Sequence, residues 1–248
     1  MADVVFNTMG TTVSLHSLTE LAEPDVLAVR EAFARLDRQF SLYRADSEAS
    51  RIARGERRLT ASTSEFREAY ARAIEWRELT MGAFTPHRPD GVIDLSGIVK
   101  AMAITAAGDE LRGRGYDDWI LNAGGDILVA GNAADSLWLA GIVDPADRAA
   151  LLCSVPLIAP WQALATSGTA ERGEHVWRTS TAAEFVQVTV LAATIEEADV
   201  LATAILSAGC TLRDDVLDCR DVDVITVDRE GQITASQRVS RHSTLVSA

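Results

Sequence analysis

The sequence has few cysteines, few positive charges and no long apolar run, and each shortage excludes a class of protein. Its three cysteines, Cys153, Cys210 and Cys219, lack CxxC or metal-ligand spacing and are odd in number, which indicates reduced, partly buried thiols in a reducing compartment. The 23 basic residues are outnumbered by 36 acidic ones, and a net charge of −13 argues against binding to nucleic acid or to an anionic membrane surface. No apolar run approaches the roughly 20 residues of a membrane-spanning helix.

The first residues also lack the features of a secretory signal. The segment MADVVFNTMGTTVSL alternates like a strand and contains no basic segment, no small-residue cleavage site and no apolar stretch of roughly 7–15 residues. Together with the reduced cysteines, this start favours a cytoplasmic protein.

What is present is the composition of an ordinary globular chain. Its 248 residues are 48% hydrophobic and 24% charged, which allows one large domain or two small ones with a sizeable core. The sequence shows no internal repeat, low-complexity block or obvious linker. An anionic ligand of so acidic a protein would require local positive charge to override the overall field.

Hydrophobic periodicity predicts several helices. Residues 23–40 carry an apolar stripe at helical spacing, and a shorter helix is expected around 47–54. A long helix over 62–82 opens with Ser62 and Glu65 as a capping box. These stripes are typical of helices that pack one face against a core.

Strands separated by Gly, Pro and Asp turns account for much of the rest, so the sequence indicates mixed α and β structure. The first of them is one strand or a bent pair, and the last is a hairpin around Glu230-Gly231. The segments are 4–18, 117–132, 136–145, 153–160, 162–168, 184–193 and 222–236. Residues 91–115 resemble a strand end, a tight turn at Ser96-Gly97 and a helix whose N-terminal amides could seat a phosphate.

A helix predicted over 195–209 carries Asp199 and Thr203 four residues apart, about one turn along the same face. In one interpretation, Asp199 is a first-turn carboxylate that complements the helix dipole and Thr203 bonds its own backbone. In the other, both oxygens bind a hard cation such as Mg²⁺, which prefers one or two carboxylates with waters and substrate phosphates.

Two further stretches allow a structural or a functional interpretation. The NAGGDI stretch, with Gly124, Gly125 and Asp126, is either a hairpin turn or a close backbone approach to a ligand. The stretch ATSGTAERGEH is either a solvated loop or a group of donors that gathers around a phosphate and a reacting hydroxyl. Its candidate residues are Thr166, Ser167, Gly168, Glu171, Arg172 and His175.

Taken in order, these pieces resemble the FAD:protein FMN transferases, the ApbE family, from one end of the chain to the other. The segments that carry the resemblance are MGTTVSL, SLYRADSEASRIARGE, GAFTPHRPDGVIDLSGIVKA, LNAGGDILVAG, ALATSGTAERGEHVW and EEADVLATAILSAG. The resemblance implies a single domain over residues 1–248, with 240–248 as a loose tail. It implies an α+β, T-fold-like architecture of mixed or antiparallel sheets with packed helices and a cleft for FAD.

The resemblance also implies an activity. Enzymes of this kind move FMN from FAD onto a threonine hydroxyl of a target flavoprotein and release AMP, with Mg²⁺ on the pyrophosphate. His175 is then the expected base, because a hydroxyl is a poor nucleophile without one. The region near Asp199 is the alternative source of that base.

Individual positions are carried over from the family in the same way. The implied metal ligands are Asp199, Thr203 and the backbone carbonyls of Val99 and Ala202. The implied positions around FAD are Met9 and Tyr43 beside its rings, Gly124, Gly125 and Asp126 at the cleft wall, Lys100 and Arg172 as positive charges, and Thr166, Ser167, Gly168 and Glu171 along the pyrophosphate and ribose.

The chain departs from the family pattern mainly on the acceptor side. After His175 the family usually continues with an apolar pair, Asp or Asn, Pro and Thr-Gly, but here the chain runs into VWRTSTAAEFVQV. Ala101, Thr85 and Ala170 also replace a usual Gly, Asp and Tyr. Two alternatives therefore stay open: a non-catalytic FAD-binding protein that serves as a carrier or sensor, and a metal-dependent FAD pyrophosphatase that releases FMN and AMP. The sequence leaves the acceptor protein, Mg²⁺ against Mn²⁺ and the oligomeric state open.

Overall fold

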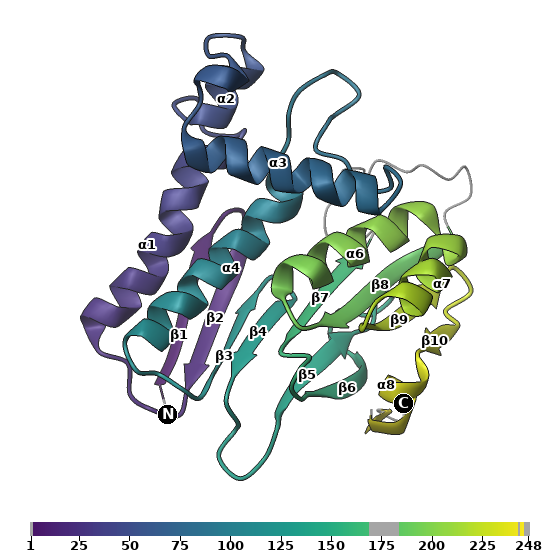
Figure 1. Ribbon diagram of the computed structural model, residues 1–248. Helices are drawn as coiled ribbons and strands as arrows, with labels where there is room; N and C mark the ends of the chain where they lie inside the picture. Colours follow the sequence, from purple (N-terminus) through teal and green to yellow (C-terminus); the bar gives the residue numbers. More distant parts are fainter. Residues whose placement is uncertain (1, 169–183, 243, 246–248) are drawn as a thin grey trace.

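The computed structural model describes residues 2–168, 184–242 and 244–245, which form two antiparallel sheets and the helices that cover them (Figure 1). The large sheet has the order β1-β2-β3-β4-β7-β8-β9-β10, and the small sheet has the order β11-β6-β5. The large sheet contains β1 (Ala2–Thr8), β2 (Thr11–Ser17), β3 (Trp119–Ala123), β4 (Asp126–Ala130), β7 (Ala163–Gly168), β8 (Phe185–Ala192), β9 (Asp223–Asp228) and β10 (Ile233–Ala235). The small sheet contains β5 (Trp138–Val143), β6 (Leu151–Leu157) and β11 (Thr244–Leu245).

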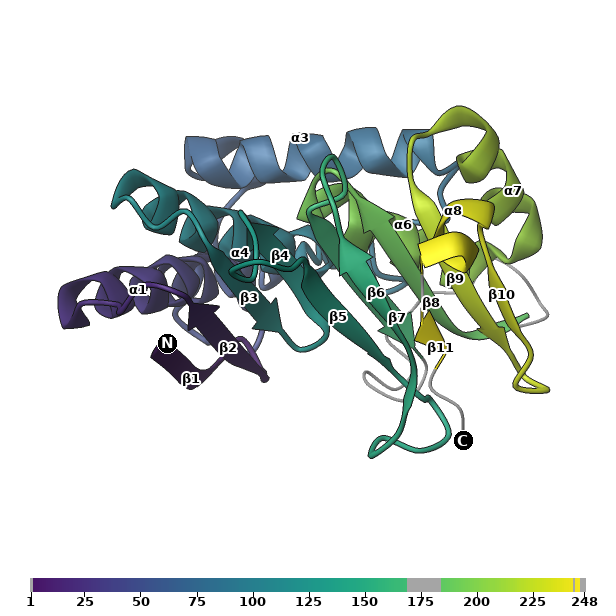
Figure 2. The same ribbon diagram turned by 90° about the horizontal axis from the view of Figure 1, so that it is seen from below.

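Most helices gather on one face of the large sheet, and the small sheet together with α8 covers part of the other face (Figure 2). The helices are α1 (Glu23–Phe40), α2 (Glu48–Ala53), the short 3₁₀ helix η1 (Leu59–Ala61), α3 (Ser64–Leu79), α4 (Ser96–Gly113), α6 (Ile195–Ala208), α7 (Cys210–Cys219) and α8 (Gln237–His242). The predicted α+β class with antiparallel sheets and packed helices is confirmed. Within the described part of the chain, no helix is both long and apolar enough to cross a bilayer.

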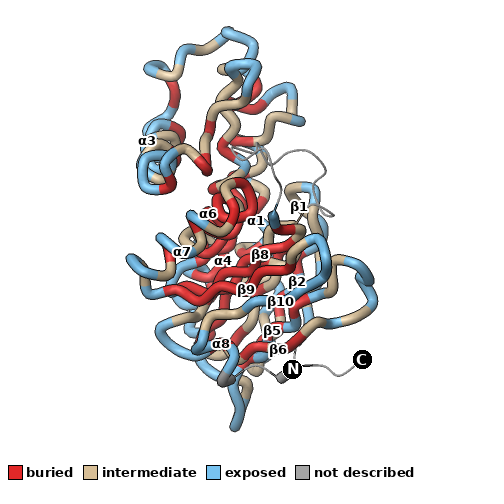
Figure 3. Tube along the Cα trace, turned by 90° about the vertical axis from the view of Figure 1, so that its right-hand side faces the viewer, coloured by how far each residue is buried: buried red, intermediate tan, exposed pale blue. Residues whose placement is uncertain are grey.

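Unequal covering of the large sheet explains its sequence patterns. Strand β2 alternates, with Val13 and Leu15 buried beneath the helices, because the small sheet covers little of its other face, where the His16 ring meets the Trp138 ring of β5 edge-on at 5.7 Å. Strand β4 is buried at all five positions, since Leu128 faces the helices while Ile127 and Val129 face the small sheet. A strand covered on both faces is an apolar run rather than an alternating one. Figure 3 shows buried residues concentrated in the strands and in α4 and α6.

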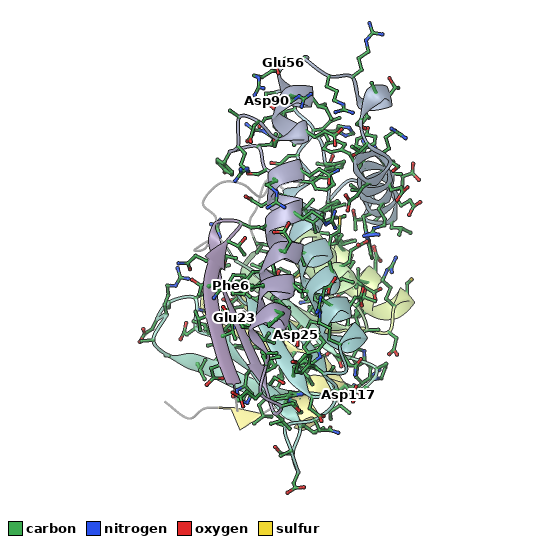
Figure 4. The ribbon with its side chains drawn as sticks, turned by 90° about the vertical axis from the view of Figure 1, so that its left-hand side faces the viewer. Phe6, Glu23, Asp25, Glu56, Asp90 and Asp117 are labelled. Atoms are coloured by element: carbon green, nitrogen blue, oxygen red, sulfur yellow. The ribbon has the colours of Figure 1, made fainter. Side chains whose placement is uncertain are left out.

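Helix α1 lies over β1, as the side view in Figure 4 shows. Phe6 of β1 meets the Phe33 ring edge-on at 5.8 Å, and the Arg30 guanidinium lies 5.2 Å from the centre of the Phe6 ring. At the other end of α1, Asp25 accepts a 2.6 Å hydrogen bond from the Tyr116 hydroxyl. The apolar stripe predicted for residues 23–40 is therefore confirmed as a core face.

The helix predicted over 62–82 is present, but its N-terminal cap is one residue later than predicted. Helix α3 starts at Ser64, and the Thr63 hydroxyl accepts the hydrogen bond from the Phe66 amide. The Ser62 hydroxyl donates to the Leu59 carbonyl instead, at 2.6 Å. Thr63 takes the capping role because Glu48 accepts hydrogen bonds from its amide and its hydroxyl and so fixes its backbone.

Three other local predictions also need correction. The tight turn predicted at Ser96-Gly97 is the first turn of α4, which follows Leu95 directly. Helix α7 was not predicted at all. The expected loose tail over 240–248 is structured where it is described, since α8 runs to His242 and Thr244–Leu245 pairs with β6.

Glu48 is a buried carboxylate whose bonds join α1, α2 and α3. It accepts hydrogen bonds from the Thr63 backbone N–H at 2.8 Å, from the Thr63 hydroxyl at 2.7 Å and from the side-chain amide of Gln39 at 3.3 Å. Burial alone would raise the pKa of Glu48, but these hydrogen bonds outweigh burial and hold it below the ordinary 4.5. The stability that the ionised group contributes is therefore complete above that ordinary value and is lost as the pH falls through the lower, folded-state value.

We predict that Glu48→Gln lowers the free energy of unfolding at neutral pH by about 1–3 kcal/mol, because an ionised acceptor is replaced by a neutral one. Urea unfolding at neutral pH and at acid pH measures the loss, which should shrink in acid. Glu56→Gln is the matched control, since Glu56 forms an exposed ion pair with Arg54 and such pairs contribute little. An equal loss for both variants would contradict the prediction.

Candidate functional site

Lys100 is the only lysine of the chain, and α4 carries it into the interior. Its exposed fraction is 8%, and its neighbours Val99 and Ala101 are buried. Helix α4 enters close to the preceding loop, because a Cβ on Gly97 would lie 2.7 Å from the Phe84 ring. This close approach places the first turn of α4, and with it Lys100, against the core.

Asp126 enters the interior from a two-glycine hairpin turn. Gly124 and Gly125 have φ values of +62° and +93°, and the Gly125 amide donates to the Asn122 side chain at 2.9 Å. The turn joins β3 to β4, so the hairpin interpretation of NAGGDI is confirmed. Asp126 is the first residue of β4 and has no exposed surface.

The ammonium group of Lys100 lies between two buried carboxylates. It contacts Asp126 Oδ2 directly and lies 3.8 Å from Asp199 Oδ1. Asp126 Oδ1 also accepts a 3.4 Å hydrogen bond from the Thr166 amide at the end of β7. Residues far apart in the sequence therefore form one charged cluster where α4, β4, β7 and α6 meet (Figure 1).

Helix α6 supplies Asp199 and Thr203 to this cluster. The Thr194 hydroxyl caps the helix, which begins at Ile195, so Asp199 lies in the second turn. The first-turn, dipole-complementing interpretation of Asp199 is therefore wrong. Thr203 Oγ1 lies 3.1 Å from Ser167 Oγ on β7, so Thr203 bonds across to the sheet.

The oxygen atoms around Asp199 fit a hard cation. Asp199 is 3% exposed, and its Oδ2 atom has no hydrogen-bond partner among the described residues. A buried carboxylate oxygen without a partner is costly, and a bound cation would satisfy it. Carboxylate and hydroxyl oxygens are ligands that Mg²⁺ accepts. No group of three His, Cys, Asp or Glu side chains that could hold a metal occurs among the described residues, so hydroxyl and carbonyl oxygens would have to complete the shell.

Comparison with known proteins decides the family. The profile of the ApbE family matches residues 9–88 and 87–226 of this chain. The chain belongs to the ApbE family. None of the curated protein sequences matches it.

Solved ApbE structures have the same fold. The ApbE protein of Thermotoga maritima is 22% identical, with a TM-score of 0.82 over 97% of this chain and 98% of that one. The flavin transferase ApbE of Vibrio cholerae is 22% identical, with a TM-score of 0.77 over 97% and 98%. The flavinyl transferase ApbE of Pseudomonas stutzeri, in its apo form, is 18% identical, with a TM-score of 0.77 over 97% of both chains.

The structure brings together one part of the site implied by the ApbE resemblance. Lys100, Asp126 and Asp199 form the charged cluster, Thr166 bonds to it, and the Ser167–Thr203 contact adjoins it. Gly168 ends β7, and Ala202 is buried on α6. Glu171, Arg172 and His175 lie outside the described residues.

The two residues expected beside the flavin and adenine rings, Met9 and Tyr43, have very different surroundings. Met9 occupies the β1–β2 turn with a left-handed φ of +49°, partly buried against the core. Tyr43 is 92% exposed, so a ring that packs on it would lie on the outside of the molecule.

The amides expected to seat a phosphate at the start of α4 are largely engaged by the chain itself. The Ser96 amide donates to the Asp94 carboxylate at 2.9 Å. The Ile98 and Val99 amides donate to the Leu95 carbonyl, both at 3.0 Å. A phosphate here would have to compete with Asp94, so this expectation is not supported.

Sequence reasoning missed two features of the site. Thr189 on β8 is buried, with its hydroxyl 2.9 Å from that of Thr166, and the strand pattern alone gave no signal for it. Thr11 on β2 lies against Gly124, where an added Cβ would come within 2.2 Å of the threonine hydroxyl oxygen. An apolar cavity of about 200 Å³, lined by Trp161 and Leu191 among others, contains none of the predicted site residues.

We predict that Gly124→Ala lowers the free energy of unfolding by about 2–4 kcal/mol, because an Ala there adds a left-handed backbone cost of about 1–2 kcal/mol to overpacking against Thr11. Gly125→Ala is the control without overpacking: its φ of +93° also carries a left-handed backbone cost, but no atom lies within 4 Å of the new Cβ. Thermal and urea unfolding of both variants measure the two losses. Adding Thr11→Ala should recover part of the loss in Gly124→Ala and none of the loss in Gly125→Ala, and equal recovery in both would contradict the prediction.

Proposed function

We propose that this protein transfers FMN from FAD to a threonine hydroxyl of a target flavoprotein, in a Mg²⁺-dependent reaction that releases AMP. The proposal extends to this chain the chemistry of the ApbE family of flavin transferases. The observation that carries it is the unpartnered Asp199 Oδ2, buried beside the Lys100–Asp126 contact. A cleft that holds FAD would bring its pyrophosphate to this cluster.

The residues proposed to hold Mg²⁺ are Asp199 and Thr203 through their side chains, with Val99 and Ala202 through their backbone carbonyls. When bound, the cation would neutralise charge on the phosphoryl oxygens and on the departing AMP. Thr203 Oγ1 is held by Ser167, which fixes its position on the α6 face that carries Asp199. The site would then be rigid before the substrate arrives.

The ion pair changes the charge balance expected from the sequence. Lys100 was expected to offer its charge to the pyrophosphate, but its ammonium group already contacts Asp126. Two carboxylates and one ammonium leave the cluster with a net negative charge. A divalent cation would supply the positive charge that this cluster lacks for binding a pyrophosphate, which supports the metal dependence of the proposed reaction.

His175 is the proposed base. The threonine oxygen of the acceptor would attack the phosphorus on the FMN side of the FAD pyrophosphate and form a new P–O bond. The bond from that phosphorus to the bridging oxygen would break, and AMP would leave with that oxygen. His175 would take the proton of the attacking hydroxyl, because histidine is the side chain that most often serves as a general base.

The deciding experiment is to incubate the protein with FAD and Mg²⁺, with and without a candidate acceptor flavoprotein, and to follow AMP release and acceptor mass. AMP together with an FMN-sized gain in mass is the expected result. AMP with free FMN would identify a pyrophosphatase. Tight FAD binding without AMP, with an acceptor that a known ApbE transferase can modify, would identify a non-catalytic FAD-binding protein.

We predict that Asp199→Ala lowers the Mg²⁺-dependent rate by at least about 100-fold, the range expected when a metal site or a group that stabilises charge is lost. The fold should persist, because Lys100 keeps its contact with Asp126. Glu197→Ala is the control on the same helix, since Glu197 pairs with Arg220 at 2.9 Å instead. Full activity of Asp199→Ala over a Mg²⁺ titration would disprove the metal assignment.

We predict that His175→Ala slows transfer by about 100-fold or more, the usual contribution of a general base, with little change in FAD affinity. Single-turnover AMP release and FAD titration separate the two quantities. Equal losses in rate and in affinity would show that His175 binds FAD rather than accepting the proton.

A further inference from the structure

The choice of lysine at position 100 is informative. The chain has 23 basic residues and one lysine, so the other 22 are arginines. Arginine presents five donors in a rigid fork, whereas lysine is a compact charge on a flexible stem. A guanidinium group at this position could bridge both carboxylates of the cluster. The ammonium instead contacts Asp126 and lies 3.8 Å from Asp199, which leaves Asp199 Oδ2 without a partner.

Asp126 is the more firmly fixed of the two carboxylates. It starts a strand that is buried on both faces, directly after a turn that glycine residues shape, and the Thr166 amide donates to its Oδ1 atom. The side chains of Lys100, Asp126 and Asp199 have exposed fractions of 10%, 0% and 4%, so water screens their attractions only weakly. Because the three charges are weakly screened, moving or removing one of them changes how strongly the other two attract or repel each other.

We propose that Asp126 is a positioning residue that holds the Lys100 ammonium group and so keeps Asp199 available to a divalent cation. The inference rests on the proposed function, because it assumes that Asp199 binds the cation. Without the charge of Asp126, the ammonium group would pair with Asp199, and an incoming cation would have to break that buried ion pair first.

Direct binding of Mn²⁺, with no FAD present, tests this inference. Calorimetry and the electron paramagnetic resonance signal of free Mn²⁺ give the affinity of the wild type, Asp126→Asn and the double variant Lys100→Met/Asp126→Asn. Asp126→Asn should bind Mn²⁺ at least about tenfold more weakly, as expected when a residue that orients a metal site is lost. The double variant should regain wild-type affinity, because it has no ammonium group to compete for Asp199.

Asp223→Asn is the matched control. Asp223 is also a buried carboxylate, hydrogen-bonded at 2.5 Å to the Ser236 hydroxyl, and it borders the apolar cavity rather than the charged cluster. Its substitution changes the net charge equally and should leave Mn²⁺ affinity unchanged.

Lys100 also provides a direct readout of the position of the ammonium group. Protein grown with lysine labelled with ¹⁵N at Nζ has one labelled side chain, so its ammonium resonance reports on position 100 alone. That resonance should shift with Mg²⁺ in the wild type, and Asp126→Asn should shift it without any metal. A merely structural role would lower stability and leave Mn²⁺ affinity intact.

Wild-type Mn²⁺ affinity in Asp126→Asn would overturn the inference, and so would a double variant as weak as Asp126→Asn. If Asp126→Asn does not fold, the Lys100 ammonium resonance of the wild type decides, because an ammonium group 3.8 Å from Asp199 should respond when Mg²⁺ binds there, and an unchanged resonance at saturating Mg²⁺ would overturn the inference. A wild type that binds no Mn²⁺ but still releases AMP and adds FMN to the acceptor would overturn this inference and leave the transfer reaction standing.

Discussion

The contact between Lys100 and Asp126 is the interaction on which the rest of the site depends. Both groups lie in an interior where an unpaired charge would be very costly, so each makes the burial of the other tolerable. The contact also fixes α4 against the start of β4, where the glycine turn delivers Asp126. Because the ammonium group contacts Asp126, the Oδ2 atom of the neighbouring Asp199 has no partner among the described residues. That oxygen atom is the one we expect a cation to bind.

Packing of small side chains makes this arrangement possible. Helix α6 packs against β7, β8 and α4, and its residues Ala198, Ala202 and Ala204 are fully buried, so small side chains let the helix backbone approach these neighbours closely. Helix α4 approaches in the same way through Gly108, whose Cβ would lie 2.9 Å from the Trp119 ring. Larger side chains at these positions would separate the helices from the sheet. The carboxylates on α6 and β4 could then no longer share one ammonium group.

Local patterns in the sequence predicted most of the fold, whereas long-range contacts account for what they missed. The apolar stripe of residues 23–40, the helix with Asp199 and the NAGGDI hairpin depend on neighbouring residues and were found. The cap of α3 moved to Thr63 because Glu48, from another helix, bonds to it. The strand at Thr244–Leu245 exists only through pairing with β6. Asp199 and Thr203 were recognised from their spacing, but the pairing of Lys100 with Asp126 could not be, since nothing local in either segment specifies the other. The family resemblance placed both at the site without that pairing.

The uneven covering of the large sheet affects which strands near the site open locally. Strands β4, β7 and β8 lie between helices and the small sheet, whereas β1 has helices on one face only. Local opening is least frequent where packing is densest, so β4, β7 and β8 should open less often than β1 at the edge of the sheet. Asp126, Thr166 and Ser167 belong to the doubly covered strands. A cation bound at Asp199 and Thr203 would therefore lie beside strands that are already ordered, and little conformational entropy of those strands would be lost when it binds.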